Sequence, residues 1–417
     1  MDYKNKSVLV VDNGIFVEIA VALAKSFGKV MYYSPWEEAY VKSNNRLVGA
    51  GLPGIERVND IFGVIDDTDL FVFPDLYHAG LQLHLESLGK RVWGSRMGEE
   101  IELERDAAKK YLKKLGLPVG KYRVIKGLDD LRKYLKEHDN VFVKVSVTRG
   151  DCESFSAKNY KYIETRLDEL EHNLGMKKKI TEFIVEDAID GAIELGYDGY
   201  TIDGQYPTIA LQGIEVKDKG YIGHVRAYKD TAKELTEYLD AIAPALKKYR
   251  YRNFKSTENR ITQDHTSFMN DATCRCPSPP SEMYSLMFEN LADIIWNGAD
   301  GKCIDPEIKH EWAAEVIIDS FWSDKNWQMV QFPEKIRDNV KLRQFTMIDG
   351  EYYVIPQNEG STTIGAAVAT GDTMDQAIEN VKVVCGQIVG YNLQIHDDAL
   401  DDAQKEIDNL KEMGIEL

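Results

Sequence analysis

The sequence predicts a multidomain protein that combines the α/β and α+β classes, and three observations lead to that prediction. Short apolar runs alternate with helical periodicity near the N-terminus, which is typical of a parallel, doubly wound sheet. Residues 122–185 follow a compact β-α-β-α-β pattern. The end of the chain changes to short strands, a hairpin and two helices. We expect three domains, at 1–96, 97–310 and 311–417 of the 417 residues.

The first domain is expected to hold four strands and two helices. The strands are predicted at 7–11, 30–33, 70–73 and 91–93, and the helices at 15–27 and 81–88. Ligands of parallel sheets bind beyond the carboxyl ends of the strands. Those ends are Asp12-Asn13-Gly14, Ser34-Pro35-Trp36 and Pro74-Asp75-Leu76-Tyr77.

The middle of the chain begins with a charged helix at 98–115, which Gly116-Leu117-Pro118 ends. Further strands are predicted at 122–125, 141–147, 181–185, 194–202 and 208–214, and helices at 128–137, 162–174, 232–249 and 283–297. A hairpin is expected over 256–262 and 267–272. The tail adds strands at 311–318, 345–348 and 365–369, an Asp349-Gly350 hairpin turn, and helices at 373–388 and 401–413.

Composition excludes several classes of protein. The formal net charge of −18 repels phosphate backbones, so we expect no nucleic-acid partner. No run of about 18 uncharged apolar residues occurs, so we expect no membrane span. The first strand is too short for a signal peptide, which makes the expected location cytoplasmic. Five scattered cysteines indicate neither a disulfide scaffold nor a structural zinc site.

Two basic motifs are candidates for binding phosphate. Lys144 lies on an otherwise apolar predicted strand, where a lysine is costly to bury unless it reaches an anion. Its alternative is an edge-strand lysine that extends to solvent. Arg105 and Lys109 lie one helical turn apart and share a helix face, although such a face is often simply solvated. The loop with Arg149 and Gly150 suits a flap over phosphates.

Two acidic motifs complete the set of candidates. The apolar strand that ends in Glu186-Asp187-Ala188 fits a hinge whose backbone could bind an adenine edge, or an ordinary strand that enters a polar turn. Glu258 and Asp271 lie on the two arms of the predicted hairpin, where opposed oxygen ligands could hold magnesium. Arg275 beyond them could bind a carboxylate or an acyl phosphate with two hydrogen bonds. A surface hairpin with scattered polar residues is the alternative.

The ordered set of motifs resembles the ATP-grasp superfamily, and within it the phosphoribosylamine–glycine ligases (glycinamide ribonucleotide synthetases) of purine synthesis. The likeness covers most of the chain and is weakest between residues 214 and 253. It implies a Rossmann-like pre-ATP-grasp domain at 1–96, an ATP-grasp domain at 97–310 with a lid subdomain at about 121–190, and a small C-terminal α+β domain at 311–417.

The resemblance also implies roles for single residues. Arg105 and Lys144 fall on phosphate-contacting positions, Glu186 and Ala188 on the adenine hinge, and Glu194 close to the ribose-contacting acid. The segment from Asp271 to Arg275 falls on the family's Glu-Phe-Asn-Cys-Arg. The implied metal ligands are therefore Glu258, Asp271 and Thr273, and the implied catalytic residues are Arg275 and Arg149.

Departures from the family pattern concern the substrate. The glycine-rich flap Gly-Lys-Gly-Val becomes Arg149-Gly150-Asp151-Cys152-Glu153, and Thr273 replaces an asparagine ligand. The turn Gly-Gly-Arg-Glu-His, which binds the phosphoribosyl substrate, becomes Asp12-Asn13-Gly14-Ile15-Phe16. Loss of that arginine and histidine indicates a different substrate.

The expected function is an ATP-dependent carboxylate–amine ligase that uses Mg²⁺ or Mn²⁺ and passes through an acyl phosphate. Its partners would be ATP and small carboxylate and amine substrates, and it would be a monomer or a homodimer. Two alternatives stay open at this point. One is a true phosphoribosylamine–glycine ligase with drifted motifs, and the other is a catalytically silent protein that keeps the nucleotide-binding fold.

Overall fold

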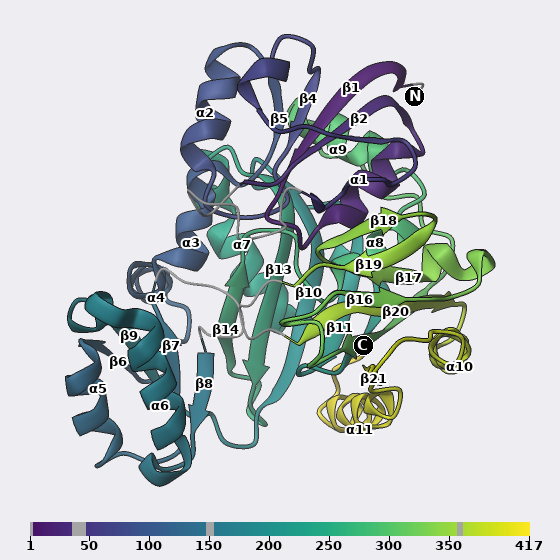
Figure 1. The fold of residues 1–417 in the computed structure, drawn as a ribbon. Helices are drawn as coiled ribbons and strands as arrows, with labels where there is room; N and C mark the ends of the chain where they lie inside the picture. The colour runs from purple at the N-terminus through teal and green to yellow at the C-terminus, as the bar shows by residue number, and fades with distance from the viewer. Residues whose placement is uncertain (1–2, 36–46, 147–153, 357–361) are drawn as a thin grey trace. The chain divides into compact units, whose positions relative to one another are not determined.

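The structure is a computed structural model that describes residues 3–35, 47–146, 154–356 and 362–417 (Figure 1). The chain divides into two compact units. The first unit consists of Met1–Gly98, Glu194–Glu258 and Thr273–Leu417, and the second of Glu99–Ile193 and Asn259–Ala272. The three expected domains, at 1–96, 97–310 and 311–417, remain a prediction.

The N-terminal part of the first unit is a parallel sheet, which confirms the predicted class. Its five strands lie in the order β3-β2-β1-β4-β5, and every neighbouring pair is parallel. The strands are β1 (Tyr3–Val11), β2 (Phe27–Tyr33), β3 (Ile55–Arg57), β4 (Leu70–Val72) and β5 (Arg91–Trp93). Helices α1 (Val17–Ala24) and α2 (Ala79–Ser87) connect them.

Both faces of this sheet are covered, as a doubly wound sheet requires. Alternate residues of β1 point to opposite faces, so Leu9 and Val11 join one core with Phe71 and with Leu85 of α2. The opposite face packs against α1 and against α9 (Leu291–Ala299). Figure 1 shows α2 on one side of these strands and α1 with α9 on the other. The carboxyl ends of β1, β2 and β4 therefore meet at one edge.

A large mixed sheet forms the rest of the first unit. Its order is β14-β13-β10-β11-β12-β15-β20-β17, with β21 paired to β15. The strands are β10 (Ile193–Ile202), β11 (Ile209–Val216), β12 (Gly220–Ala227), β13 (Arg252–Ile261), β14 (Ser267–Thr273), β15 (Trp312–Asp319), β17 (Val340–Leu342), β20 (Thr363–Gly371) and β21 (Gln394–Ile395). β13 and β14 form a hairpin whose outer end, Asn259–Ala272, belongs to the second unit.

Helices pack on this large sheet. α8 (Ser281–Met287) contacts β15 and β20, α10 (Met374–Cys385) contacts the same two strands, and α11 (Ala399–Glu412) contacts β11 and β12. α7 (Lys233–Lys248) follows β12 in the chain. A separate three-stranded sheet has the order β16-β19-β18, with β16 (Gln328–Val330), β18 (Phe345–Ile348) and β19 (Glu351–Val354). Asp349 and Gly350 both have positive φ between β18 and β19, which confirms the predicted hairpin turn.

The second unit is built on a four-stranded antiparallel sheet in the order β6-β9-β7-β8. Its strands are β6 (Tyr122–Lys126), β7 (Val141–Val145), β8 (Ser154–Ala157) and β9 (Glu182–Asp187). Leucines of α5 (Leu128–Leu135) and α6 (Tyr160–Leu174) bury a shared core against the sheet, including Leu131 and Leu167 at 0% exposure. The short α3 (Glu100–Leu103) and α4 (Arg105–Lys114) precede it.

Two predicted helices were wrong, and β12 is among the strands that the sequence analysis missed. The single helix at 283–297 is two helices, because Phe288 is extended and bridges to Ile308. The helix at 98–115 is interrupted at Glu104, whose ψ of 62° is not helical. β12 was missed because glycines and polar residues break up its apolar alternation.

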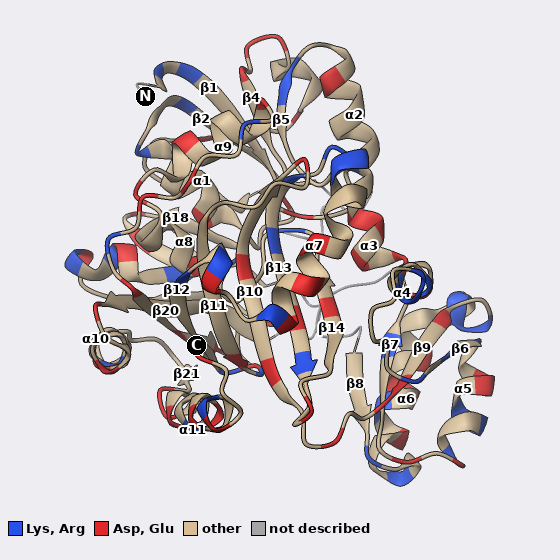
Figure 2. Ribbon diagram, turned by 180° about the vertical axis from the view of Figure 1, so that it is seen from behind, with Lys and Arg blue, Asp and Glu red and all other residues tan. Residues whose placement is uncertain are grey.

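The described part of the chain contains no helix with the length and apolarity needed to cross a bilayer. Charges of both signs lie side by side on α5 and α6 (Figure 2), where Arg132 pairs with Asp168 at 2.7 Å. Such half-exposed pairs contribute little to stability. Although the chain has 69 acidic and 51 basic residues, ion pairs between opposite charges still form within the second unit.

Candidate functional site

Three cationic side chains lie together inside the second unit. α4 places Arg105 and Lys109 one turn apart, and both are only 7% exposed, so the face is buried rather than solvated. Lys144 on β7 is 6% exposed. Because burying a cation is costly unless it is paired, each of these groups needs a compensating acceptor.

Glu186 on β9 is the acidic partner of this cluster. Lys109 Nζ lies 2.8 Å from Glu186 Oε1, and Lys144 Nζ lies 3.9 Å from Glu186 Oε2. Backbone carbonyls also accept hydrogen bonds from these cations: Lys144 donates to Asn270 O at 2.7 Å, and Arg105 donates to Val145 O at 3.0 Å. We refer to Arg105, Lys109, Lys144 and Glu186 as the cation cluster. It carries three positive charges against one negative charge.

The predicted hinge lies next to this cluster in the sequence. Asp187 N donates to Lys121 O at 3.0 Å, and Ala188 N donates to Asn140 O at 3.3 Å. Both hinge N–H groups are therefore occupied within the unit, and binding an adenine edge through Ala188 would require its long bond to open. Beside the hinge lies a cavity of about 730 Å³, lined by residues before β6, by Asp187–Gly191 and by the turn between β13 and β14.

Three glutamates of the first unit form a second cluster, which we call the glutamate cluster. Glu194 on β10, Glu215 on β11 and Glu258 on β13 each offer one carboxylate oxygen, and these oxygens lie within 4.8 Å of one another. The pairing of Gly196 with Gly213, continued by two residues, places Glu194 opposite Glu215. All three side chains are half-buried.

Burial and mutual repulsion both act on the pKa of Glu215. Its pKa is raised to about 7, chiefly by burial and to a smaller extent by the neighbouring Glu194, while Lys217 opposes the shift. Lys217 Nζ stands 3.6 Å from Glu215 and is 77% exposed, so its screening is weak. Carboxylates crowded in this way fit a divalent cation with oxygen ligands, such as Mg²⁺ or Mn²⁺.

The other predicted site residues are distributed differently. Asp271 is half-buried and belongs to the second unit, whereas Thr273 is buried in the first. Thr273 O accepts a hydrogen bond from Lys255 at 3.3 Å. Arg275 is half-buried and donates to Cys276 O at 3.0 Å. Arg149 lies outside the described residues.

Glu215 is the site residue that sequence analysis missed. The predicted strand ended at residue 214, one position before Glu215, whereas β11 continues to Val216. Counting outward from the Asp203-Gly204 turn places Glu194 opposite Gly213, two residues from Glu215, whereas the observed pairing of Gly196 with Gly213 brings Glu194 opposite Glu215. The observed register therefore joins Glu194 to a carboxylate cluster, rather than leaving it as an isolated ribose contact.

The carboxyl edge of the parallel sheet holds buried polar residues. Asp12 is fully buried, and its Oδ2 accepts from Gly14 N at 3.0 Å, Phe16 N at 2.8 Å and the Tyr32 hydroxyl at 2.7 Å. Burial, with a smaller effect from Asp75, raises the pKa of Asp12 to about 6. Trp36 lies outside the described residues. Asp12 and Asp75 make this edge acidic, while Arg57 at the end of β3 donates to Ser34 O at 2.9 Å.

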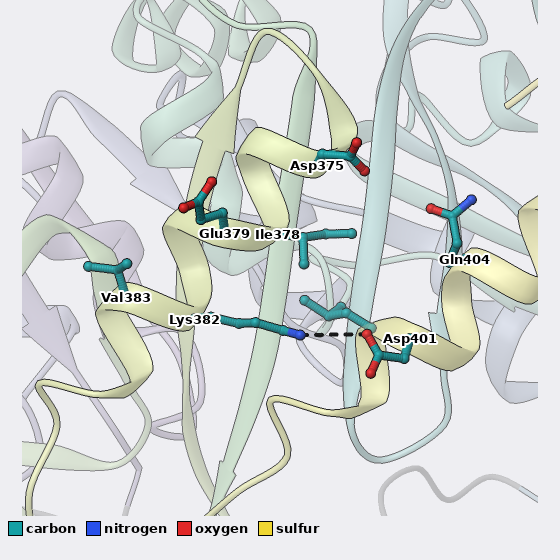
Figure 3. Close-up of a pocket in the computed structure, with 8 residues that line it drawn as sticks. Asp375, Ile378, Glu379, Lys382, Val383, Asp401 and Gln404 are labelled. Carbon is teal, nitrogen blue, oxygen red and sulfur yellow. Dashed lines mark ion pairs between the residues drawn. The ribbon is translucent and has the colours of Figure 1, made fainter.

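A further cavity of about 600 Å³ lies between α10 and α11 (Figure 3). Lys382 and Asp401 point toward each other across it, 3.5 Å apart, while Asp375 and Glu379 stand along α10. None of the predicted site residues lines this groove. Its exposed charges make it useful as a control surface.

The chain has the fold of ATP-grasp enzymes. No protein-family model and no curated protein sequence matches it. Solved structures of ATP-grasp enzymes match nearly its whole length, which confirms the fold that the motifs indicated.

Three of these structures show the extent of the likeness. Phosphoribosylamine–glycine ligase from Thermotoga maritima has a TM-score of 0.69 at 17% identity, covering 94% of this chain and 99% of that chain. The biotin carboxylase domain of Hydrogenobacter thermophilus 2-oxoglutarate carboxylase was solved with MgADP and bicarbonate. It has a TM-score of 0.63 at 12% identity, and the match covers 94% of this chain and 92% of that chain. L-amino acid ligase from Bacillus licheniformis has a TM-score of 0.60 at 14% identity, and the match covers 93% of this chain and 98% of that chain.

Proposed function

We propose that this protein is an ATP- and Mg²⁺-dependent ligase that joins a carboxylate to an amine. The observation that carries the proposal is the cation cluster, in which Arg105, Lys109 and Lys144 are buried and Glu186 lies 2.8 Å from Lys109 and 3.9 Å from Lys144. Several cations buried in one place favour the binding of a multiply charged anion. On the ATP-grasp fold, the phosphates of ATP are that anion.

The hinge cavity supports binding of the nucleotide base by the same unit. Its volume of about 730 Å³ lies within the range of small-molecule sites. Asp187 and Ala188 line its wall, and Phe268 supplies an apolar surface. We propose that the base lies here and that Arg105, Lys109 and Lys144 bind the phosphates.

The glutamate cluster supports a magnesium or manganese site. Glu258 keeps its proposed role as a ligand, and Glu194 and Glu215 join it, because their oxygens lie within 4.8 Å of one another. Asp271 and Thr273 stay proposed ligands by resemblance alone. When bound, the ion would neutralise phosphate charge and so lower the barrier to attack on phosphorus.

The reaction that we propose has two steps. A substrate carboxylate oxygen attacks the γ-phosphorus of ATP, the bond to the β-phosphate oxygen breaks, and an acyl phosphate and ADP result. A neutral amine then attacks the acyl carbon, phosphate leaves, and the nitrogen gives up a proton to form the amide. Arg275 is proposed to hold the acyl phosphate, and Arg149 to exclude water, which would otherwise hydrolyse it.

A substrate other than phosphoribosylamine is favoured by the acidic strand edge. Asp12 and Asp75 occupy the ends of β1 and β4, where a phosphate group would meet negative charge. The purine-pathway alternative therefore has little support from this part of the first unit.

The decisive experiment measures thermal stability with MgATP, because a ligand that binds only the native state raises its melting temperature. Wild type should be stabilised, and Lys144→Ala should lose that shift. Asp168→Asn, on the exposed face of α6, is the matched control and should keep it. ADP release with carboxylate and amine mixtures then tests turnover. A shift without turnover would favour a silent nucleotide-binding protein, and robust product from glycine and phosphoribosylamine would favour the purine enzyme.

A further inference from the structure

Glu315 is a buried carboxyl group that the proposed reaction does not use. It lies on β15 with 0% exposure. Within the described part of the chain, neither of its side-chain oxygens has a hydrogen-bond partner. Buried polar groups are normally satisfied, so a carboxyl group with two unsatisfied oxygens points to a ligand that is absent from the structure.

Strand register relates Glu315 to the glutamate cluster. Glu215 on β11 is paired with Tyr221 on β12, and Tyr221 is paired with Glu315 on β15. Residues that pair directly across antiparallel strands share one face of the sheet. Glu315 therefore lies on the same face as Glu215, two strands further on, which is roughly 10 Å away.

The surroundings of Glu315 are mainly acidic. Glu282 on α8, Glu215 and Asp198 all lie near enough to raise its pKa, and Arg343 is the one cation that lowers it among the interactions resolved for this group. Arg343 is already engaged, because its Nη2 donates to Ser278 Oγ at 2.5 Å and to Glu282 Oε1 at 3.2 Å.

Tyr284 adds a second unsatisfied group. It lies on α8 with 0% exposure, and its hydroxyl has no hydrogen-bond partner among the described residues. Its electrostatic neighbours include Asp198 and Glu282, which also surround Glu315. The two carboxyl oxygens of Glu315 can accept from the N–H donors of an ammonium group, and Tyr284 shares its acidic surroundings.

From this arrangement we infer that the amine substrate is a small aliphatic diamine, and that Glu315 binds the ammonium group that does not react. This inference rests on the proposed ligase function. The amine that attacks an acyl phosphate must be neutral, so an ammonium group held by Glu315 is not the one that reacts. Glu315 lies two strands away from Glu215, so the bound ammonium group and the reacting amine would be at opposite ends of one molecule.

The test uses 1,4-diaminobutane as the probe and 1,4-butanediol, which has similar length and no charge, as the control ligand. With MgADP present, the diamine should raise the melting temperature of wild type and the diol should not. Titration calorimetry should show at least a tenfold weaker Kd for the diamine with Glu315→Gln, which keeps the size of the side chain and removes its charge.

Two controls make the outcomes distinct. Asp401→Asn removes an exposed carboxylate from the α10–α11 groove and should leave diamine binding unchanged. The MgADP shift of Glu315→Gln should equal that of wild type, which shows that the variant is folded and binds nucleotide. Equal diamine affinity in wild type and Glu315→Gln would overturn the inference, as would no binding in the presence of a normal MgADP shift. Loss of the MgADP shift in wild type would instead refute the ligase proposal itself.

Discussion

Lys109 and Glu186 form an ion pair of 2.8 Å inside the second unit, with side chains only 9% and 13% exposed. Glu186 also lies 3.9 Å from Lys144, so one carboxylate compensates two buried ammonium groups. Removing a single partner from such a pair leaves an uncompensated buried charge, which is the costly case.

Glu186→Gln should therefore lower the free energy of unfolding by about 3 kcal/mol. Chemical denaturation measures this change. MgATP should restore more stability to this variant than to wild type, because the phosphates replace the lost negative charge. Asp168→Asn, which removes a 67% exposed partner of Arg132, should change stability by less than about 1 kcal/mol. A Glu186→Gln protein as stable as wild type would show that the Glu186 carboxylate does not compensate the charges of the buried lysines.

From the raised pKa of Glu215 we predict that metal binding depends on pH. Its pKa is raised to about 7, and a metal binds only the deprotonated carboxylate, so protons compete with the ion below that pH. The affinity for Mn²⁺, followed by electron paramagnetic resonance, should be about tenfold weaker at pH 6 than at pH 8. Glu215→Gln should bind weakly at both values. An unchanged affinity across this range in wild type would argue that Glu215 is not a ligand.

Asp12 predicts a pH dependence of folding stability. Its folded pKa is about 6 and its ordinary value is 3.8, so between these values the folded state holds a proton that the unfolded state has released. Stability should then fall as pH rises from about 4 to about 6, by an amount on the order of 3 kcal/mol for this group.

Asp12→Asn removes that titration and keeps an oxygen that can accept from Tyr32. Denaturation at several pH values should give this variant a flatter profile than wild type between pH 4 and 6. Other carboxylates titrate in both proteins, so the difference between the two profiles is the quantity to measure. Parallel profiles would contradict the assigned shift.

Gly213 lies beneath the ring of Tyr221. A Cβ at this position would stand 1.9 Å from the Tyr221 hydroxyl oxygen, which donates to Asp198 Oδ2 at 2.5 Å. Gly213→Ala should therefore displace the ring, break that bond and destabilise the first unit by about 1–3 kcal/mol. Gly80→Ala, with no atom within 4 Å of its new methyl group, is the matched control and should be nearly neutral. Thermal unfolding compares the two.

Local signals predicted much of the fold. The strand at 91–93 matches β5, and the Asp349-Gly350 turn formed as expected, because both depend on neighbouring residues. The ordered motifs identified the ATP-grasp fold at 12–17% identity to the matched structures, where no family model matches. Phe288 escaped prediction because its extended conformation depends on Ile308, which is distant in the sequence.

The candidate site was less predictable, because it depends on burial and on strand register. The spacing of Arg105 and Lys109 is the same whether their helix face is solvated or buried. Tertiary packing determines which of the two occurs, and here it buries both side chains. Glu186 was expected to serve the hinge, whereas its side chain pairs with two lysines. In the sequence, Glu315 is a single acidic residue within a largely apolar predicted strand. Only the strand register across β11, β12 and β15 relates it to Glu215.

The second unit is assembled from two separate pieces of the chain, Glu99–Ile193 and Asn259–Ala272. The main-chain oxygen that accepts from Lys144 belongs to Asn270, in the shorter piece. A polypeptide covering only 99–193 would therefore lack the main-chain oxygen that accepts from Lys144, and it would not reproduce the surroundings of that lysine in the intact protein. A faithful minimal fragment must splice both pieces together.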